Sequence, residues 1–305
     1  MKKILCLILC IVLSFQMLGC AKNKSVSNSK RPEMNKAQML HKNTYSLKST
    51  NRVNGRQGVC YEDGFYYVSG SATLSKYDKN WKLIKENTNP FVGYKKNVNH
   101  IGDIDVYNNE LYLGVEYFMD GVGKNIQIAI YDIDTLKLKR TFNFEAKSGQ
   151  KECSGIVVNP DNKTVSMCSW VGEESGRYLY NYNLKSGAYI GKVHMQMPPQ
   201  WIQGIAYYNG DYYMTADDGD ADSNEPDHLY RTSFDPKDSF ATVVLERTFD
   251  DVKRYGEIEG LSFDKKNKKM FLLYNRGAKI VLGMPKGFYK GYKEEISEVY
   301  TYKIK

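Results

Sequence analysis

The sequence lacks the short motifs that mark the common enzyme classes. It has no glycine-rich nucleotide loop, no HExxH zinc motif and no GxSxG nucleophile motif, so those mechanisms are not indicated. Its six cysteines have no metal-type spacing. Beyond the N-terminal region only Cys60, Cys153 and Cys168 remain. They are either small core residues, or Cys153 and Cys168 form a single disulfide.

Long apolar runs are also absent after residue 19. Residues 1–19 contain Lys2 and Lys3, then the apolar run "ILCLILCIVLSFQM". This run is shorter than the roughly 20 residues that cross a bilayer, so we interpret residues 1–19 as a signal peptide. It ends at "MLGC", which resembles the lipobox of bacterial lipoproteins. The resemblance implies a diacylglycerol with chains such as palmitate on Cys20, and a lipid-anchored protein on the outer side of the cell membrane.

The lipobox resemblance is not complete. The family prefers Leu three places before the cysteine and a small residue next, where this chain has Met17 and Leu18. The alternative is an ordinary secreted protein that is cleaved elsewhere.

An excess of acidic residues is lacking, and the net charge is +8. Much of this charge lies in residues 20–42, which hold six Lys and Arg residues against a single Glu. We expect this Ser/Asn/Lys-rich segment to be a disordered tether, attracted weakly to an anionic bilayer. Residues 43–305 are then close to neutral, and we expect no nucleic-acid partner.

What the sequence does contain is a repeat. The five copies are "RQGVCYEDGFYYVSG" (56–70), "HIGDIDVYNNELYLGVE" (100–116), "ECSGIVVNPDNKTVSMCSW" (152–170), "WIQGIAYYNGDYYMTAD" (201–217) and "GEIEGLSFDKKNKKMFLLYN" (256–275). Their anchor positions are Gly58, Asp103, Gly155, Gly204 and Gly260, which are 45, 52, 49 and 56 residues apart. A strand-rich period near 50 is typical of a propeller or an array.

Each copy has the pattern of a hairpin, and two more strand segments follow most copies. Four strands per repeat predict an all-β fold, a β-propeller of five blades over residues 43–305, with six blades as the alternative. The fifth copy lacks a fourth strand, which "NTYSLKS" (43–49) can supply. Pairing the two ends of the domain in this way would leave no open sheet edge.

Polar residues occupy repeat positions that we expect near the propeller axis. They are Gln57, His100, Glu116, Glu152, Trp201, Gln203, Asp217, Glu257 and Glu259. Carboxylates gathered there repel one another unless they hold protons or bind a cation. Calcium is the expected ion, and its candidate ligands are Asp103, Glu116, Glu152, Glu257 and Glu259. A water-filled channel with solvated ends is the alternative.

Several axial residues allow more than one role. His100 and Glu259 are the candidates for moving a proton, although a histidine at a strand start often bonds a neighbouring loop. The candidate ligand-binding residues are Gln57, Trp201, Gln203 and Asp217. Trp201 either stacks on a sugar or other ring of a ligand, or packs below the mouth of the propeller channel.

Two loops also have alternative interpretations. The acidic loop 216–227 has alternate Asp residues that suit calcium, but it lacks the EF-hand frame, and the alternative is a solvated acidic loop. Residues 283–295 either touch a membrane or form a solvated insert between strands.

The phrases "RQGVCYEDGFYYVSG", "NHIGDIDVYNNELYLGVE", "SMCSWVGEESGRYLYNYNL" and "GEIEGLSFD" together resemble an uncharacterised family of extracytoplasmic bacterial β-propeller lipoproteins. More distantly, "EGL" is similar to the SdiA-regulated and phytase-like propellers, and "QG" to plant-type glutaminyl cyclase, whose channel holds an ion. These resemblances imply a secreted propeller with an axial site and transfer no reaction.

We therefore expect a membrane-anchored protein that binds a small molecule, glycan or partner protein at the channel mouth. The alternatives are a calcium-assisted hydrolase or lyase and a surface protein without a ligand.

Overall fold

The computed structural model describes residues 42–305, except 172–173 and 254. The predicted signal peptide, Cys20 and all but the last residue of the predicted tether lie outside the described residues. In the described chain the structure is almost entirely β, with two short 3-10 turns, η1 (Ala146–Ser148) and η2 (Ser175–Arg177). No helix in this part of the chain is long and apolar enough to span a membrane.

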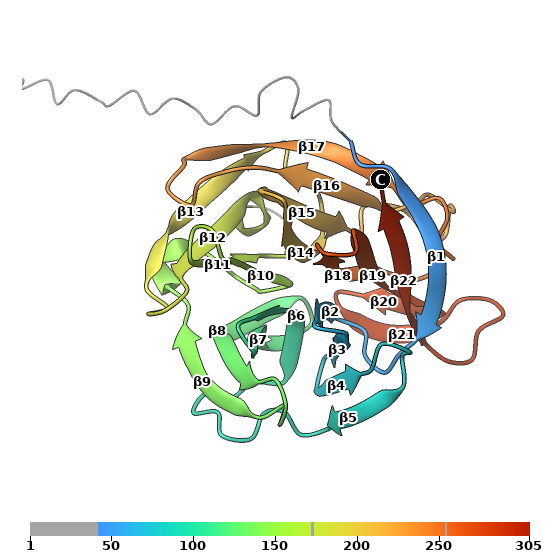
Figure 1. The fold of residues 1–305 in the computed structure, drawn as a ribbon, viewed down its shortest axis with the longest axis horizontal. Coiled ribbons are helices and arrows are strands. Elements are labelled where there is room, and N and C mark those ends of the chain that lie inside the picture. The colour runs from blue at the N-terminus through green and yellow to red at the C-terminus, as the bar shows by residue number, and fades with distance from the viewer. Residues whose placement is uncertain (1–41, 172–173, 254) are drawn as a thin grey trace, which may run out of the picture. The chain divides into compact units, whose positions relative to one another are not determined.

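Five antiparallel units of four strands surround a common centre (Figure 1). The first blade consists of β2 (Gly58–Glu62), β3 (Phe65–Gly70), β4 (Thr73–Tyr77) and β5 (Leu83–Asn87). The second consists of β6 (His100–Tyr107), β7 (Glu110–Met119), β8 (Val122–Asp132) and β9 (Leu138–Asn143). The third consists of β10 (Gly155–Asn159), β11 (Thr164–Cys168), β12 (Tyr178–Asn183) and β13 (Tyr189–Gln196). The fourth blade consists of β14 (Ile202–Tyr208), β15 (Asp211–Ala216), β16 (His228–Thr232) and β17 (Phe240–Thr248). The fifth consists of β18 (Ile258–Asp264), β19 (Lys269–Arg276), β22 (Ile296–Ile304) and β1 (Tyr45–Arg52). The third and fourth blades join where β13 pairs in parallel with β17.

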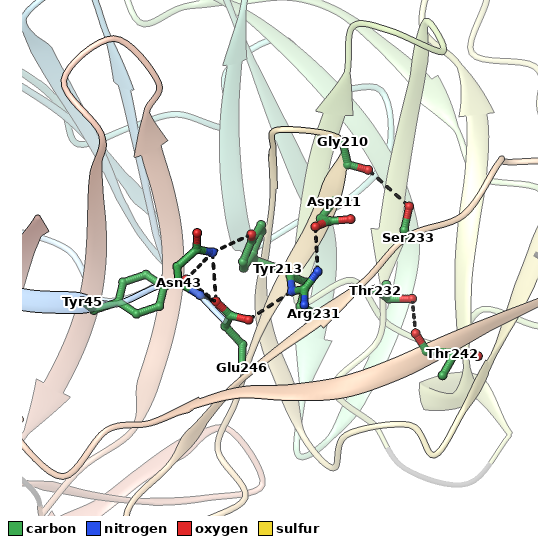
Figure 2. Close-up of polar contacts among 10 residues, drawn as sticks. All are labelled: Asn43, Tyr45, Gly210, Asp211, Tyr213, Arg231, Thr232, Ser233, Thr242 and Glu246. Atoms are coloured by element: carbon green, nitrogen blue, oxygen red, sulfur yellow. Dashed lines mark hydrogen bonds and ion pairs between the residues drawn. The ribbon is translucent and has the colours of Figure 1, made fainter. Parts of the chain in front are cut away.

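The predicted closure of the ring is confirmed. Strand β1 pairs antiparallel with β22, from Tyr45 opposite Ile304 to Arg52 opposite Glu298. The N-terminal segment is also fastened to the fourth blade, as Figure 2 shows. There Asn43 Nδ2 and Tyr45 Oη each donate a hydrogen bond of 2.9 Å to Glu246 Oε1, and Arg231 Nε donates one of 3.0 Å to Glu246 Oε2. Both ends of the domain thus lie in one sheet.

Turn residues explain why two of the repeats form tight hairpins. Asn108 and Asn109, between β6 and β7, both have positive φ, at 53° and 59°. Asn209 and Gly210, between β14 and β15, have φ of 52° and 91°. Two-residue turns with both φ values positive match the twist of paired strands, and Asn and Gly tolerate that conformation best.

The glycines at the repeat anchors mark close approach at the axis. A Cβ on Gly204 would lie 2.5 Å from Gly260 Cα, and one on Gly260 would lie 2.7 Å from Gly58 Cα. The one anchor that is not glycine is Asp103, whose carboxylate accepts hydrogen bonds from the N–H groups of Ile104 (2.8 Å) and Ile205 (3.1 Å). It therefore connects the second blade to the fourth through the centre of the ring.

The hydrophobic core lies between neighbouring blades. Each pair of adjacent sheets buries aliphatic and aromatic side chains, such as Val68 and Phe271 between the first and fifth blades. The described cysteines Cys60, Cys153 and Cys168 are buried free thiols, so Cys153 and Cys168 do not pair.

Candidate functional site

A small pit of about 30 Å³ lies on the axis, where the innermost strands begin. Every blade contributes a polar side chain to its wall. The lining residues are Arg56, Gln57, His100, Phe118, Glu152, Ser154, Trp170, Gln203, Glu257, Glu259 and Gly283. Six of the residues predicted from the repeat thus lie together in one place: Gln57, His100, Glu152, Gln203, Glu257 and Glu259.

Arg56 dominates one wall of the pit. Its Nη2 lies 2.7 Å from Glu257 Oε2 and 3.7 Å from Glu259 Oε1, and its Nε lies 3.1 Å from Glu295 Oε1. Burial raises the pKa of Glu257 to about 7, although Arg56 opposes the shift. Burial and the charge of Glu257 raise the pKa of Glu259 well above its ordinary value. One guanidinium therefore faces three carboxyl groups, two of which line the pit.

Arg56 is absent from the predicted set. Strand alternation from Gln57 points the side chain of Arg56 away from the axis. The residues just before β2 are not in a strand, so alternation does not apply there and the Arg56 side chain reaches the pit. The matching positions in the other copies are buried and apolar: Ile101, Cys153, Ile202 and Ile258. An arginine at a position that is otherwise core is the signal that could have identified it.

His100 forms another part of the wall. Its Nε2 lies 3.1 Å from Gln57 Oε1, and its Nδ1 lies 3.4 Å from Glu116 Oε1. Burial and the nearby charge of Arg56 lower the pKa of His100 to about 4. The imidazole is therefore neutral at neutral pH. With Nε2 donating to Gln57, Nδ1 carries no proton, which suits a protonated Glu116 as its neighbour.

Glu116 and Glu152 form a buried carboxyl pair behind and beside His100. Burial raises the pKa of Glu116 to about 8. Burial and the charge of Glu116 raise the pKa of Glu152 well above its ordinary value, although Glu152 Oε2 accepts a hydrogen bond from Trp170 N. Two carboxyls in one apolar site do not both ionise readily, so the pair holds at least one proton near neutral pH.

Above the pit the surface is hollowed in three places that meet at Trp170 and Trp201. The hollows have volumes of about 380, 630 and 250 Å³. The smallest continues from the pit, because both are lined by Trp170, Glu257 and Gly283. Trp201, which is 43% exposed, stands on this rim. The hollows and the pit form one mouth, which we call the axial mouth.

A hairpin of the fifth blade extends over the axial mouth. It consists of β20 (Ala278–Val281) and β21 (Met284–Phe288), which pair antiparallel. Its tip, Leu282 and Gly283, reaches the second blade, because a Cβ on Gly283 would lie 2.6 Å from Phe118 Cε1. The segment 283–295, predicted as a membrane contact or a solvated insert, thus includes part of the cover of the pit.

Four predicted residues lie outside the pit, and one of them is Trp201 on the rim. Asp217 lines the adjoining 250 Å³ hollow, where burial and the charge of Glu257 raise its pKa well above the ordinary value. Glu116 lies behind the lining. Asp103 lies at the centre of the ring, where backbone N–H groups already occupy its oxygens. In the acidic loop, Asp218 accepts a hydrogen bond from Tyr230 Oη (2.6 Å) and lies 2.8 Å from His228 Nδ1.

No three or more His, Cys, Asp or Glu side chains among the described residues gather in a way that could hold a metal ion. The repulsion that suggested calcium is relieved here by Arg56 and by carboxyl protons, and calcium stays a prediction.

Comparisons with known proteins give structural likeness only. No protein-family model matches the chain, and no curated protein is similar to it. Similar solved structures include the PQQ-bound aldose sugar dehydrogenase of Streptomyces coelicolor, at 12% identity, 85% of this chain, 98% of that chain and a TM-score of 0.45. A hydrazine synthase of Kuenenia stuttgartiensis is similar at 10% identity over 73% of this chain and 56% of that chain, with a TM-score of 0.42. U3-55K is similar at 10% identity over 80% of this chain and 67% of that chain, with a TM-score of 0.40.

The chain spans just over half of the hydrazine synthase chain it resembles. None of these likenesses is close enough to indicate a function. The chain is therefore identified by its own topology alone, as a β-propeller protein.

Proposed function

We propose that this protein is a lipid-anchored, extracytoplasmic β-propeller that binds a small ligand at the axial mouth. The observation that carries the binding role is the convergence of polar side chains from all five blades on one pit. Positions that a plain core would fill with Val or Ile hold groups that donate and accept hydrogen bonds. Residues far apart in sequence thus converge as in a ligand site, with few polar groups beneath an aromatic rim.

The anchoring part of the proposal depends on the N-terminal sequence. The short apolar run and the Gly19–Cys20 pair support processing and lipidation, and the basic segment that follows suits a bilayer surface. A tether of this kind would hold the propeller close to the membrane while the axial mouth remains open to ligands.

A screen with a matched pair of variants tests the binding role. Melting temperatures of the full-length protein are measured with a panel of small sugars, organic acids and amines. A ligand that binds the native state alone raises stability by about 2.7 kcal/mol at a hundredfold excess over Kd. We expect such a compound to lose its effect in Trp201→Ala and Gln203→Leu and to keep it in Phe65→Ala. Phe65 is a similarly exposed aromatic residue, at the start of β3.

The proposal fails if no compound in the panel depends on Trp201 or Gln203. The same assay with calcium and with a chelator examines the alternative, a calcium-assisted hydrolase or lyase that uses His100 and Glu259. Binding is better supported, because the pit is small and already contains the Arg56 guanidinium.

A further inference from the structure

The pit and the hollow that continues from it carry more carboxyl groups than cations. Glu152, Glu257 and Glu259 line the pit, and Asp217 and Asp220 line the hollow that continues from it. Arg56 is the one Lys or Arg side chain in these two linings, and its three nearest carboxylates already exceed its charge. A ligand that completes this site would therefore bring positive charge.

The size of the pit limits the group that enters it. A volume of about 30 Å³ admits one or two waters or one ammonium group, because a cavity needs roughly 10–15 Å³ to hold a water. The adjoining hollow, at about 250 Å³, has room for a carbon chain. Trp170, Trp201 and Tyr289 line that hollow, and aromatic faces attract organic cations.

Two polar groups in the pit have hydrogen-bonding capacity left. Glu259 is 2% exposed, and its Oε1 accepts a hydrogen bond of 2.8 Å from Asn275 Nδ2. Its other oxygen has no partner among the residues that the structure describes. The side chain of Gln203 also makes no hydrogen bond within this part of the chain. A carboxyl oxygen of Glu259 and the amide oxygen of Gln203, both in the lining of a small pit, form a natural acceptor pair for an N–H donor.

We propose that the ligand of the axial mouth is an organic amine, with its ammonium group in the pit and its carbon chain in the adjoining hollow. This inference rests on the proposed function and names its ligand class. The ammonium group would donate hydrogen bonds to Glu259 and Gln203, and the hairpin tip at Gly283 would lie over it. The aromatic rim would cover the methylene groups of the chain.

Amine binding should be coupled to proton release. Glu257 faces Arg56, Glu259 and Glu295, with Asp217 and Tyr289 nearby, and burial raises its pKa to about 7. An ammonium group favours the ionised carboxylates, so affinity should rise between about pH 6 and pH 8 as these protons leave.

Tryptophan fluorescence of the full-length protein in mild detergent tests the proposal. The probes are 1,4-diaminobutane and methylammonium, with butane-1,4-diol as the uncharged control of matched length. We expect a saturable response to the diamine and none to the diol. Glu259→Gln should weaken diamine binding about tenfold to a hundredfold, because a charged hydrogen bond is lost. Glu110→Gln should bind as the wild type does, since Glu110 pairs with Lys139 and Arg140 away from the mouth.

Circular dichroism establishes whether the variants fold. If Glu259→Gln does not fold, Gln203→Ala serves as the second test. The inference is overturned if neither amine gives a saturable response, or if the diamine binds both pit variants as tightly as the wild type. A neutral compound whose binding depends on Trp201 would overturn the inference that the ligand is an amine, while leaving the proposed function in place. Failure of the amines and of the whole panel would remove both.

Discussion

Replacing Glu116 by Gln should change how the stability of the protein depends on pH. Glu116 is fully buried, and burial raises its pKa from 4.5 to about 8. Between these two values the folded chain keeps a proton that the unfolded chain releases. The free energy of unfolding therefore falls as pH rises through this range, and the stabilisation is complete only below the unfolded pKa.

The size of the effect follows from the number of protons. A difference of one bound proton changes the free energy of unfolding by about 1.4 kcal/mol per pH unit. Glu116→Gln removes this titration and also relieves Glu152 of a neighbouring charge, which lowers the pKa of Glu152. Across two pH units, from about 5.5 to 7.5, the variant should lose about 3 kcal/mol less than the wild type.

Urea denaturation at several pH values measures this slope. Glu110→Gln is the matched control, because hydrogen bonds from Arg140 hold the pKa of Glu110 at about 2. Glu110 is ionised in both states across the window, so its replacement should leave the slope unchanged. Parallel curves for Glu116→Gln and the wild type would show that Glu116 is already ionised in the folded protein, and the buried proton would be refuted.

Three other substitutions examine separate parts of the structure. Arg56→Met leaves buried carboxylates unpaired and should cost about 3 kcal/mol in urea denaturation at pH 7.5, with a smaller loss in acid; equal losses at both pH values would contradict its electrostatic role. Asp103→Asn replaces one of the two oxygens that accept from Ile104 and Ile205 by an NH2 group facing a backbone N–H, and it should lower the free energy of unfolding by about 2 kcal/mol or more; an unchanged free energy would rule out this link between the second and fourth blades. Cys20→Ser should move the protein from the membrane to the soluble fraction, and continued membrane association would argue against lipidation.

The fold could be predicted because each repeat encodes its own hairpin. Positive-φ turns such as Asn209–Gly210 and the glycine anchors are local features, and the missing fourth strand of the last copy indicated closure by residues 43–49. Once the ring is assumed, its geometry brings His100, Gln203 and Glu259 together without further information.

The remaining parts of the site depend on tertiary contacts that the repeat does not encode. Arg56 reaches the pit from a segment outside any strand, and Asp103 uses its carboxylate on backbone amides at the centre of the ring. Trp170 and the β20–β21 hairpin come from connections between strands, where the copies differ. Alternation predicts which face of a strand is axial, but it does not apply to such connections.

The most direct test of the account is a crystal structure of the protein grown with 1,4-diaminobutane. The account predicts a nitrogen of the diamine in the pit, within about 3 Å of a carboxylate oxygen of Glu259. Its carbon chain should lie along Trp170 and Trp201. A diamine bound elsewhere, or a pit that contains only water at a saturating concentration, would contradict it.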